Sequence, residues 1–149
     1  MNEVKITIPG RPVPKGRPRI SYRGRSVILY TPPETENYEK GVARAGKEAC
    51  TSPATGLVEM EIAVYFNPQA KVYTKGGRRR PGTLPELDNC VKSIVDGLNK
   101  VAYVDDRQVT RILAERKIDP VERAEVVIRE ELRGISPKSV GANSFAQTP

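Results

Sequence analysis

Apolar and polar residues alternate without interruption from residue 58 to residue 66, and this stretch constrains the fold more than any other. Val58, Met60, Ile62, Val64 and Phe66 share one face of an extended strand, because successive side chains of a strand point to opposite faces. A strand with one apolar face buries that face against a second layer. The chain is therefore built around a sheet that has a cover on one side.

Shorter patterns predict the other elements. Thr31-Pro32-Pro33-Glu34 is a capping-box candidate with proline in the first helical turn, so a helix is expected from there to a point before Pro53. The remaining elements, in chain order, are a strand at residues 4–8, a hairpin with its turn at 22–25, a helix from 86 to about 100, and strands at about 108–118 and 124–131.

We expect an α+β fold, with a mixed sheet of about five strands, two helices on one face, and the order β-β-β-α-β-α-β-β. A length of 149 residues suits one domain, which we assign to residues 1–132. Residues 133–149 are rich in Ser, Gly, Pro and Asn and have no periodicity, so they are predicted to be a disordered tail.

The second helix has an apolar stripe with charged residues beside it. On a helical wheel with about 100° per residue, the predicted stripe lies at about 240° to 340° when Asp88 is placed at 0°. It contains Leu87, Val91, Ile94, Val95 and Leu98. Asp88, Lys92 and Asp96 fall at about 0°, 40° and 80°. These three side chains are expected at the rim of the core, where a cleft would lie.

The formal net charge is +7, which indicates an anionic partner. No acidic residue occurs between Val4 and Pro33 or between Ile62 and Pro85, and both stretches are rich in Lys and Arg. The basic residues lie in Gly/Pro-rich loops and not along an amphipathic helix, which favours nucleic acid over a membrane surface. The basic loop residues singled out for DNA binding are Lys15, Arg17, Arg19, Lys75, Arg78, Arg79 and Arg80.

The chain has no histidine, which excludes histidine-dependent nucleases, serine triads and zinc sites built on imidazole. Its two cysteines, Cys50 and Cys90, are far apart in sequence and suggest neither a zinc knuckle nor a disulfide framework. Cys90 lies at about 200° on the wheel and is expected to pack as a small apolar group. Without a signal-like or membrane-spanning apolar run, we expect a cytoplasmic protein.

Carboxylates reappear directly after the second basic stretch, at Glu86 and Asp88, and again at Asp105-Asp106. A polyanion attracted by the basic loops would meet these carboxylates, an arrangement that makes sense if divalent cations lie between them. The simpler interpretation is also open. Glu86 and Asp88 could cap the helix, Asp88 and Lys92 could form a surface pair, and Asp105-Asp106 could be a solvated turn.

Three segments together resemble a known signature: Glu86-Leu87-Asp88-Asn89 with Lys92, Asp96-Gly97-Leu98, and Asp105-Asp106-Arg107-Gln108-Val109. They are similar, in order and spacing, to the D-x-D-N-x-x-K, D-x-L and D-D-x-Q-V pattern of the RusA family of Holliday junction resolvases. The Pro14–Arg19 segment and the Tyr30–Glu39 stretch are similar to members found in phages and prophages. The resemblance spans about residues 4–130.

The resemblance implies a homodimeric endodeoxyribonuclease that cuts four-way DNA junctions in recombination and repair. Carried over by position, it implies that Glu86, Asp88 and Asp106 bind one or two Mg²⁺ ions, for which Mn²⁺ could substitute, and that Lys92 is the catalytic lysine. It implies no organic cofactor and no membrane partner. Glu86 departs from the pattern, which has Asp there, and its extra methylene changes the reach of the carboxylate.

Two other functions stay open at this point. The chain could be a nuclease for other branched or flapped DNA, or a basic DNA-binding protein whose metal site Glu86 has impaired.

Overall fold

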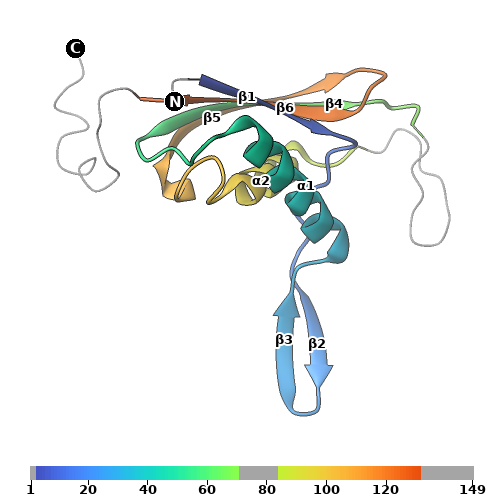
Figure 1. Cartoon of the computed structure of the whole chain (residues 1–149). Coiled ribbons are helices and arrows are strands. Elements are labelled where there is room, and N and C mark those ends of the chain that lie inside the picture. Colours follow the sequence, from blue (N-terminus) through green and yellow to red (C-terminus); the bar gives the residue numbers. More distant parts are fainter. Residues whose placement is uncertain (1–2, 71–83, 132–149) are drawn as a thin grey trace.

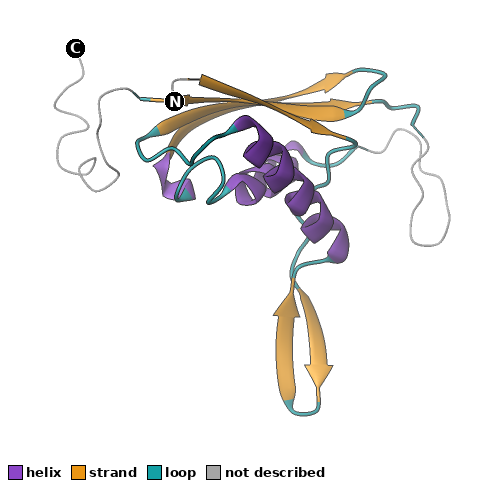
Figure 2. Cartoon of the chain, in the orientation of Figure 1, coloured by secondary structure: helices purple, strands orange, loops and turns teal. Residues whose placement is uncertain are grey.

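The structure is a computed structural model, which describes residues 3–70 and 84–131 (Figure 1). Its elements, in chain order, are β1 (Glu3–Pro9), β2 (Arg19–Arg23), β3 (Ser26–Tyr30), α1 (Pro33–Ala49), β4 (Val58–Phe66), α2 (Leu87–Leu98), a 3-10 turn (Asp106–Gln108), β5 (Val109–Ile118) and β6 (Arg123–Glu130). The predicted α+β class and element order are confirmed (Figure 2). The predicted tail at residues 133–149 and the loop at residues 71–83 lie outside the described part of the chain.

The main sheet has four strands in the order β1-β6-β4-β5. β6 pairs antiparallel with β1 and with β4, whereas β4 pairs parallel with β5, so the sheet is mixed as predicted. The expected count of about five strands differs because β2 and β3 pair with each other in a separate two-stranded sheet. The segment before β2 is held against both helices and leads the hairpin away from the main sheet (Figure 1).

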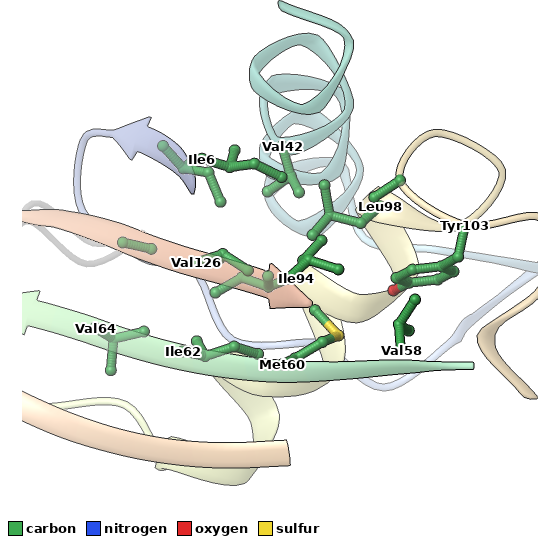
Figure 3. Packing of buried hydrophobic residues seen from close by; sticks show 14 of the residues in the cluster. Ile6, Val42, Val58, Met60, Ile62, Val64, Ile94, Leu98, Tyr103 and Val126 are labelled. Carbon is green, nitrogen blue, oxygen red and sulfur yellow. The ribbon is translucent and has the colours of Figure 1, made fainter. Parts of the chain in front are cut away.

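Both helices cover the same face of the main sheet (Figure 1). Every second residue of β4, from Val58 to Phe66, is buried in the core between the sheet and the helices. Figure 3 shows four of them, from Val58 to Val64. Ile6, Val126 and Ile128 extend this core along the sheet, and Val42 and Ile94 close it from the helices. The alternation from Val58 to Phe66 therefore defines the buried face of the sheet.

Helix α1 begins without the capping box that its sequence predicts. Pro32 is the N-cap, with an extended backbone, and no side chain caps the helix. Thr31 stands one residue too early for the role, and its capping prediction is wrong. The proline in the first turn is observed, and it fits because that position needs no backbone donor.

Helix α2 buries a face that is rotated from the predicted stripe. Ile94 and Leu98 are buried as expected, together with Cys90, Ser93 and Gly97, whereas Leu87, Val91 and Val95 are only partly buried. Small residues on the buried face let α1 approach closely. Asp88, Lys92 and Asp96 are exposed, which confirms their placement at the rim. Neither described helix is long and apolar enough to cross a membrane.

Candidate functional site

The start of α2 presents two exposed carboxylates. Glu86 is the N-cap residue, and its carboxylate accepts a hydrogen bond of 3.1 Å from the side-chain amide of Asn89. Asp88 accepts a hydrogen bond of 2.9 Å from the backbone N–H of Asn89. Negative charge is favoured here because the first turn of a helix has unpaired N–H groups and the positive end of the helix dipole. Asn89 thus orients the carboxylate of Glu86, a role its position in the motif allows.

Lys92 lies one turn after Asp88 on the same flank of α2. The two side chains border an open groove between α2 and β5, whose remaining lining is Leu87, Val91 and Ala114. A guanidinium N–H of Arg116 donates a 2.6 Å hydrogen bond to the carbonyl of Pro85, which ties the start of α2 to β5. The groove, to which we refer as the α2–β5 groove, is therefore apolar along its floor and charged at its rim.

The second carboxylate group lies after α2, in the turn that precedes β5. Asp105 caps this turn by accepting a hydrogen bond of 2.9 Å from the backbone N–H of Arg107. The side chain of Gln108 is buried, and it accepts a hydrogen bond of 2.8 Å from the backbone N–H of Asp105. Its amide donates to the carbonyls of Ala54 and Gly56, both at 2.8 Å. Gln108 therefore fixes the position of the exposed Asp106.

Gln108 belongs to the motif that includes Asp105 and Asp106, but the motif alone assigns it no role. The signal was present, because Asp105-x-x-Gln108 has the spacing of a capping box, in which a residue at N3 reaches back to the N-cap backbone. The burial of Gln108 could not be read from that spacing.

The carboxylates around this turn interact. The Arg107 guanidinium, which lies 2.9 Å from Asp105, holds the pKa of Asp105 well below its usual value. A shared hydrogen bond with Asp105, followed by desolvation and the negative charges of Asp105 and Asp96, raises the pKa of Asp106. The turn and the end of α2 thus concentrate negative charge at one place, where a cation would relieve the repulsion.

The donor chemistry of Glu86, Asp88 and Asp106 suits Mg²⁺, which prefers oxygen ligands and binds through one or two carboxylates and several waters. Within one chain, however, these three carboxylates do not form a single cluster. Within residues 3–70 and 84–131, no group of three or more His, Cys, Asp or Glu side chains is placed to hold one ion. Asp106 interacts with Asp96, which lies about 12 Å along α2 from Asp88 at 1.5 Å per residue. The predicted site residues therefore form two groups.

Lys15, predicted to contact DNA, is bonded within the protein. Its ammonium group lies 2.7 Å from Glu39 of α1 and 3.0 Å from Asp96 of α2, so it joins the two helices. Its backbone N–H also donates to the carbonyl of Asn89 at 2.8 Å. Burial would lower the pKa of Lys15, but the hydrogen bonds to Glu39 and Asp96 outweigh burial and leave the pKa raised.

Two of the other basic residues predicted to bind DNA are described. Arg17 is exposed, and Arg19 lies at the base of the β2–β3 hairpin with its guanidinium 3.7 Å from Glu34. Lys75, Arg78, Arg79 and Arg80 lie outside the described residues.

Cys90 packs as the sequence predicts. It is buried in the core, and burial raises the pKa of its thiol to about 11. The thiolate, which is the nucleophilic form, is therefore scarce at neutral pH.

The chain is similar to a known protein family and to a bacterial protein. The family described as "Endodeoxyribonuclease RusA" matches residues 9–129. The chain is also similar to the "Uncharacterized protein YqaN" of Bacillus subtilis (strain 168), with 34% identity over 139 residues. That match covers 87% of this chain and 98% of the Bacillus protein.

Proposed function

This chain belongs to the RusA endodeoxyribonuclease family, and from that membership we propose that it resolves four-way (Holliday) DNA junctions by paired symmetric nicks in the presence of Mg²⁺. The enzyme class follows from the family, which covers most of the chain. The observation that carries the finer proposal is the exposed flank of α2, where Asp88 and Lys92 stand side by side.

We assign metal binding to Glu86, Asp88 and Asp106, with one or two Mg²⁺ ions per chain and Mn²⁺ as a substitute. When bound, Mg²⁺ neutralises negative charge on the scissile phosphate and favours water as the nucleophile. Asn89 holds the Glu86 carboxylate toward solvent, and Gln108 holds the turn that carries Asp106. These contacts hold the Glu86 carboxylate and the Asp106 turn in place, each within its own group.

Lys92 has an electrostatic role in this proposal. The phosphate gains negative charge as the bond to the leaving oxygen breaks, and an ammonium group beside it stabilises that charge. Lys92 is exposed next to Asp88, so it can reach a phosphate that Asp88 approaches through a cation. Groups with this role typically contribute about a hundredfold or more to the rate.

In this proposal DNA is held by the two basic segments that precede the carboxylates in the sequence. Arg17 and Arg19 are exposed near the hairpin, and we extend the assignment to Lys75, Arg78, Arg79 and Arg80, for which the sequence is the support. Lys15 contributes positive charge from its place between the helices. The proposal includes a homodimer, because a four-way junction has approximate two-fold symmetry and two copies supply two identical nicks.

One experiment tests the function. The purified protein is incubated with a four-way junction, a flapped duplex and a linear duplex of the same sequence, each with and without Mg²⁺. We expect paired nicks in the junction alone, and only with Mg²⁺. Equal or faster cutting of the flap would identify a nuclease for other branched DNA. Binding without cutting in either Mg²⁺ or Mn²⁺ would identify a DNA-binding protein.

A further inference from the structure

The β2–β3 hairpin has two chemically different faces. Paired residues of an antiparallel ladder lie on the same face, and the register pairs Ile20 with Leu29 and Tyr22 with Val27. One face therefore consists of these four large side chains, and we call it the apolar face. Both arginines of the strands lie on the opposite face, in the pairs Arg19–Tyr30 and Arg23–Ser26.

A tight turn fixes this arrangement. Arg23 pairs with Ser26, so Gly24 and Arg25 form a two-residue turn. Gly24 has a φ of 61°, and hairpin turns of this length require a positive φ at their first central residue. The turn sets the register of the strands, and the register decides which residues share the apolar face.

The apolar face is open to solvent. Ile20, Tyr22, Val27 and Leu29 are exposed by 54%, 74%, 59% and 67%. The hairpin extends away from the sheet and the helices (Figure 1). Contiguous exposed apolar side chains mark an interaction surface, so we looked for a partner that suits both faces of the hairpin.

The charge of the hairpin indicates a polyanion. Residues 16–25 contain four arginines and no carboxylate. Glu34 of α1 lies 3.7 Å from Arg19 and balances one of these charges. Contacts between proteins exclude charge from their apolar centre and pair it with opposite charge at the rim. The hairpin supplies no carboxylate for such pairs, whereas DNA phosphates would complement its arginines.

The hairpin is mounted beside the candidate site. The backbone N–H of Lys15 donates to the carbonyl of Asn89 at 2.8 Å, and the hydroxyl of Ser93 donates to the carbonyl of Val13 at 2.6 Å. From Lys15 the chain needs at most about 14 Å to reach the start of β2. The strands are each five residues long, which gives an arm of about 17 Å at 3.4 Å per residue. DNA bound near the start of α2 is therefore within reach of the arm.

Branched DNA offers a surface that suits the apolar face. In a linear duplex each base is stacked between its neighbours, so its faces are covered. At the branch point of a four-way junction the base pairs of different arms meet, and regular stacking is interrupted. Apolar side chains can insert at disturbed base steps, and aromatic rings stack on base faces. The cost of unstacking is lowest where pairing or stacking is already disturbed.

We propose that the β2–β3 hairpin recognises the branch point of the DNA. Tyr22 and Leu29 on the apolar face stack on bases there, while Arg23 on the opposite face binds phosphate of an adjoining arm. The inference rests on the proposed function, because it takes the four-way junction as the substrate. Every DNA carries phosphate, but only the branch has uncovered base faces. The apolar face therefore favours branched over linear DNA, whereas the arginines strengthen binding to both.

Substitutions on the two faces test this recognition. Tyr22→Thr and Leu29→Thr remove large side chains but keep residues that favour strands. Ile28→Thr is the matched control, because Ile28 adjoins Leu29 and lies on the opposite face. Affinities for a four-way junction and a linear duplex are measured by mobility shift in Ca²⁺, and circular dichroism checks that each variant is folded.

We expect Tyr22→Thr and Leu29→Thr to weaken junction binding at least about fivefold, the effect of losing one stacked base, and to leave duplex binding unchanged. Ile28→Thr should bind both DNAs as the original protein does. Tyr22→Phe keeps the ring and should retain the original affinity for the junction.

Salt dependence separates stacking from ionic contacts. Stacking releases no counterions, so Tyr22→Thr should leave the slope of log K against log salt unchanged. Arg23→Ala removes a phosphate contact and should lower that slope by about 0.9 on both DNAs. A reduced slope for Tyr22→Thr would show that this change acts through the arginines, and it would overturn the inference.

A photochemical crosslink locates the contact. Junctions carry iododeoxyuridine either at the branch point or in the middle of one arm, and ultraviolet light links this base to an aromatic ring stacked on it. Mass spectrometry then identifies the linked residue. We expect a link to Tyr22 from the branch label and none from the arm label, with Tyr30 of the opposite face unlinked. The absence of a link from the branch label, or equal links from both labels, would overturn the inference.

Other outcomes separate this inference from the proposed function. A Tyr22→Thr protein that loses junction and duplex affinity equally would make the hairpin a general DNA contact and overturn the inference. Unchanged junction affinity would also overturn it, and a changed mass in analytical ultracentrifugation would then identify a protein partner for the apolar face. Branch-point links to Tyr22 in a protein that cuts no junction in Mg²⁺ would support the inference and overturn the proposed function.

Discussion

Gly97 of α2 lies directly against Val42 of α1, so close that a Cβ atom added at Gly97 would stand 2.7 Å from the Cβ atom of Val42. The same added atom would be 3.0 Å from the backbone carbonyl oxygen of Glu39. The separation of the two helices therefore depends on the absence of a side chain at position 97. Since α2 carries Asp88 and Lys92, this contact also determines where the site residues lie relative to the rest of the protein.

We predict that Gly97→Ala lowers the free energy of unfolding by about 1–3 kcal/mol, because the helices must separate to admit the methyl group. Gly41→Ala is the matched control, since it adds the same methyl group to α1 where, apart from the adjoining helix backbone, nothing lies within 4 Å of the new Cβ. That variant should be neutral or stabilising by up to about 1 kcal/mol through helix propensity. The free energy of unfolding of both variants is measured by urea denaturation. Equal values for Gly97→Ala and Gly41→Ala would contradict the close packing of the helices.

Asp88→Asn and Asp106→Asn should each abolish junction cleavage while junction binding stays intact or becomes tighter. Each change removes a carboxylate that we assign to Mg²⁺ and relieves repulsion of the phosphate. Cleavage is followed on gels and binding by mobility shift in Ca²⁺. Glu36→Gln, an exposed carboxylate change on α1, is the control and should cut at the original rate. If either variant cut as fast as this control, the residue changed in it would not be a metal ligand.

Substitutions at Glu86 distinguish a role in Mg²⁺ binding from a role at the helix terminus. If Glu86 binds Mg²⁺, Glu86→Gln should abolish cleavage, because an amide oxygen is a poor ligand for this ion, and Glu86→Asp should keep measurable activity. If Glu86 acts only on the helix terminus, Glu86→Gln should cost about 1 kcal/mol or less of stability and leave cleavage intact. Cleavage rate against Mg²⁺ concentration distinguishes the two. A Glu86→Gln protein with the original rate and Mg²⁺ midpoint leaves Asp88 and Asp106 as the ligands.

Lys15→Met should destabilise the fold by about 1.5–3 kcal/mol, because it removes charge-assisted hydrogen bonds to Glu39 and Asp96 in a partly buried setting. The raised pKa gives the effect a pH dependence. Stability contributed by Lys15 is complete below its usual value of 10.5 and is lost as the pH rises through the higher folded-state pKa. The stability difference between the original protein and Lys15→Met should therefore be constant near neutral pH and shrink above pH 10.5.

Lys40→Met is the control for Lys15, because its pair with Glu36 is exposed and joins residues of one helix. Its cost should be about 0.5 kcal/mol or less. A Lys15→Met variant as stable as Lys40→Met would show that Lys15 is free to bind DNA, as the sequence alone predicts.

Changing Arg78, Arg79 and Arg80 together to Ala should weaken junction binding and flatten its dependence on salt. Each lost phosphate contact lowers the slope of log K against log salt by about 0.9 on duplex arms. Binding isotherms at several NaCl concentrations measure the slope. A slope equal to that of the original protein would show that these arginines do not contact phosphate.

Much of the fold can be predicted from the periodicity of apolar residues in the sequence. The alternation from Val58 to Phe66 identified the buried face of the sheet, and the observed bounds of α2, β5 and β6 lie close to the predicted ones. The pairing of the strands cannot be predicted in this way, because a two-residue period shows which face of a strand is buried but not which strand lies next to it. The β2–β3 hairpin illustrates this limit, since its sequence does not show that it forms a sheet of its own.

The helical wheel placed the charged residues of α2 correctly and the apolar ones less well. Asp88, Lys92 and Asp96 are exposed as predicted, whereas the buried face is centred on small residues such as Ser93 and Gly97. Apolar size is a poor guide where two helices touch, because close approach favours small side chains. For the same reason, the wheel predicts Val91 and Val95 in the core, whereas both are only partly buried.

The assignment of Glu86, Asp88 and Asp106 to the site comes from the motif and stays a prediction. Sequence separation does not state which of these residues meet in space. The interactions that position them come from distant segments. Gln108 bonds to Ala54 and Gly56, and Lys15 reaches Asp96, and neither partner can be inferred from local pattern.

The pairing of β1 with β6 has a consequence for how the protein is made. β1 pairs with β6 alone within the main sheet, and the ladder joins Glu3 to Arg129. During synthesis β1 is therefore made long before β6, and its backbone groups find their partners in the main sheet only when β6 has emerged. Such long-range pairing slows folding and leaves strand edges open to other chains in the meantime. A nascent chain that stops before β6 lacks the strand that joins β1 to β4, so premature termination should yield aggregates and not a smaller folded nuclease.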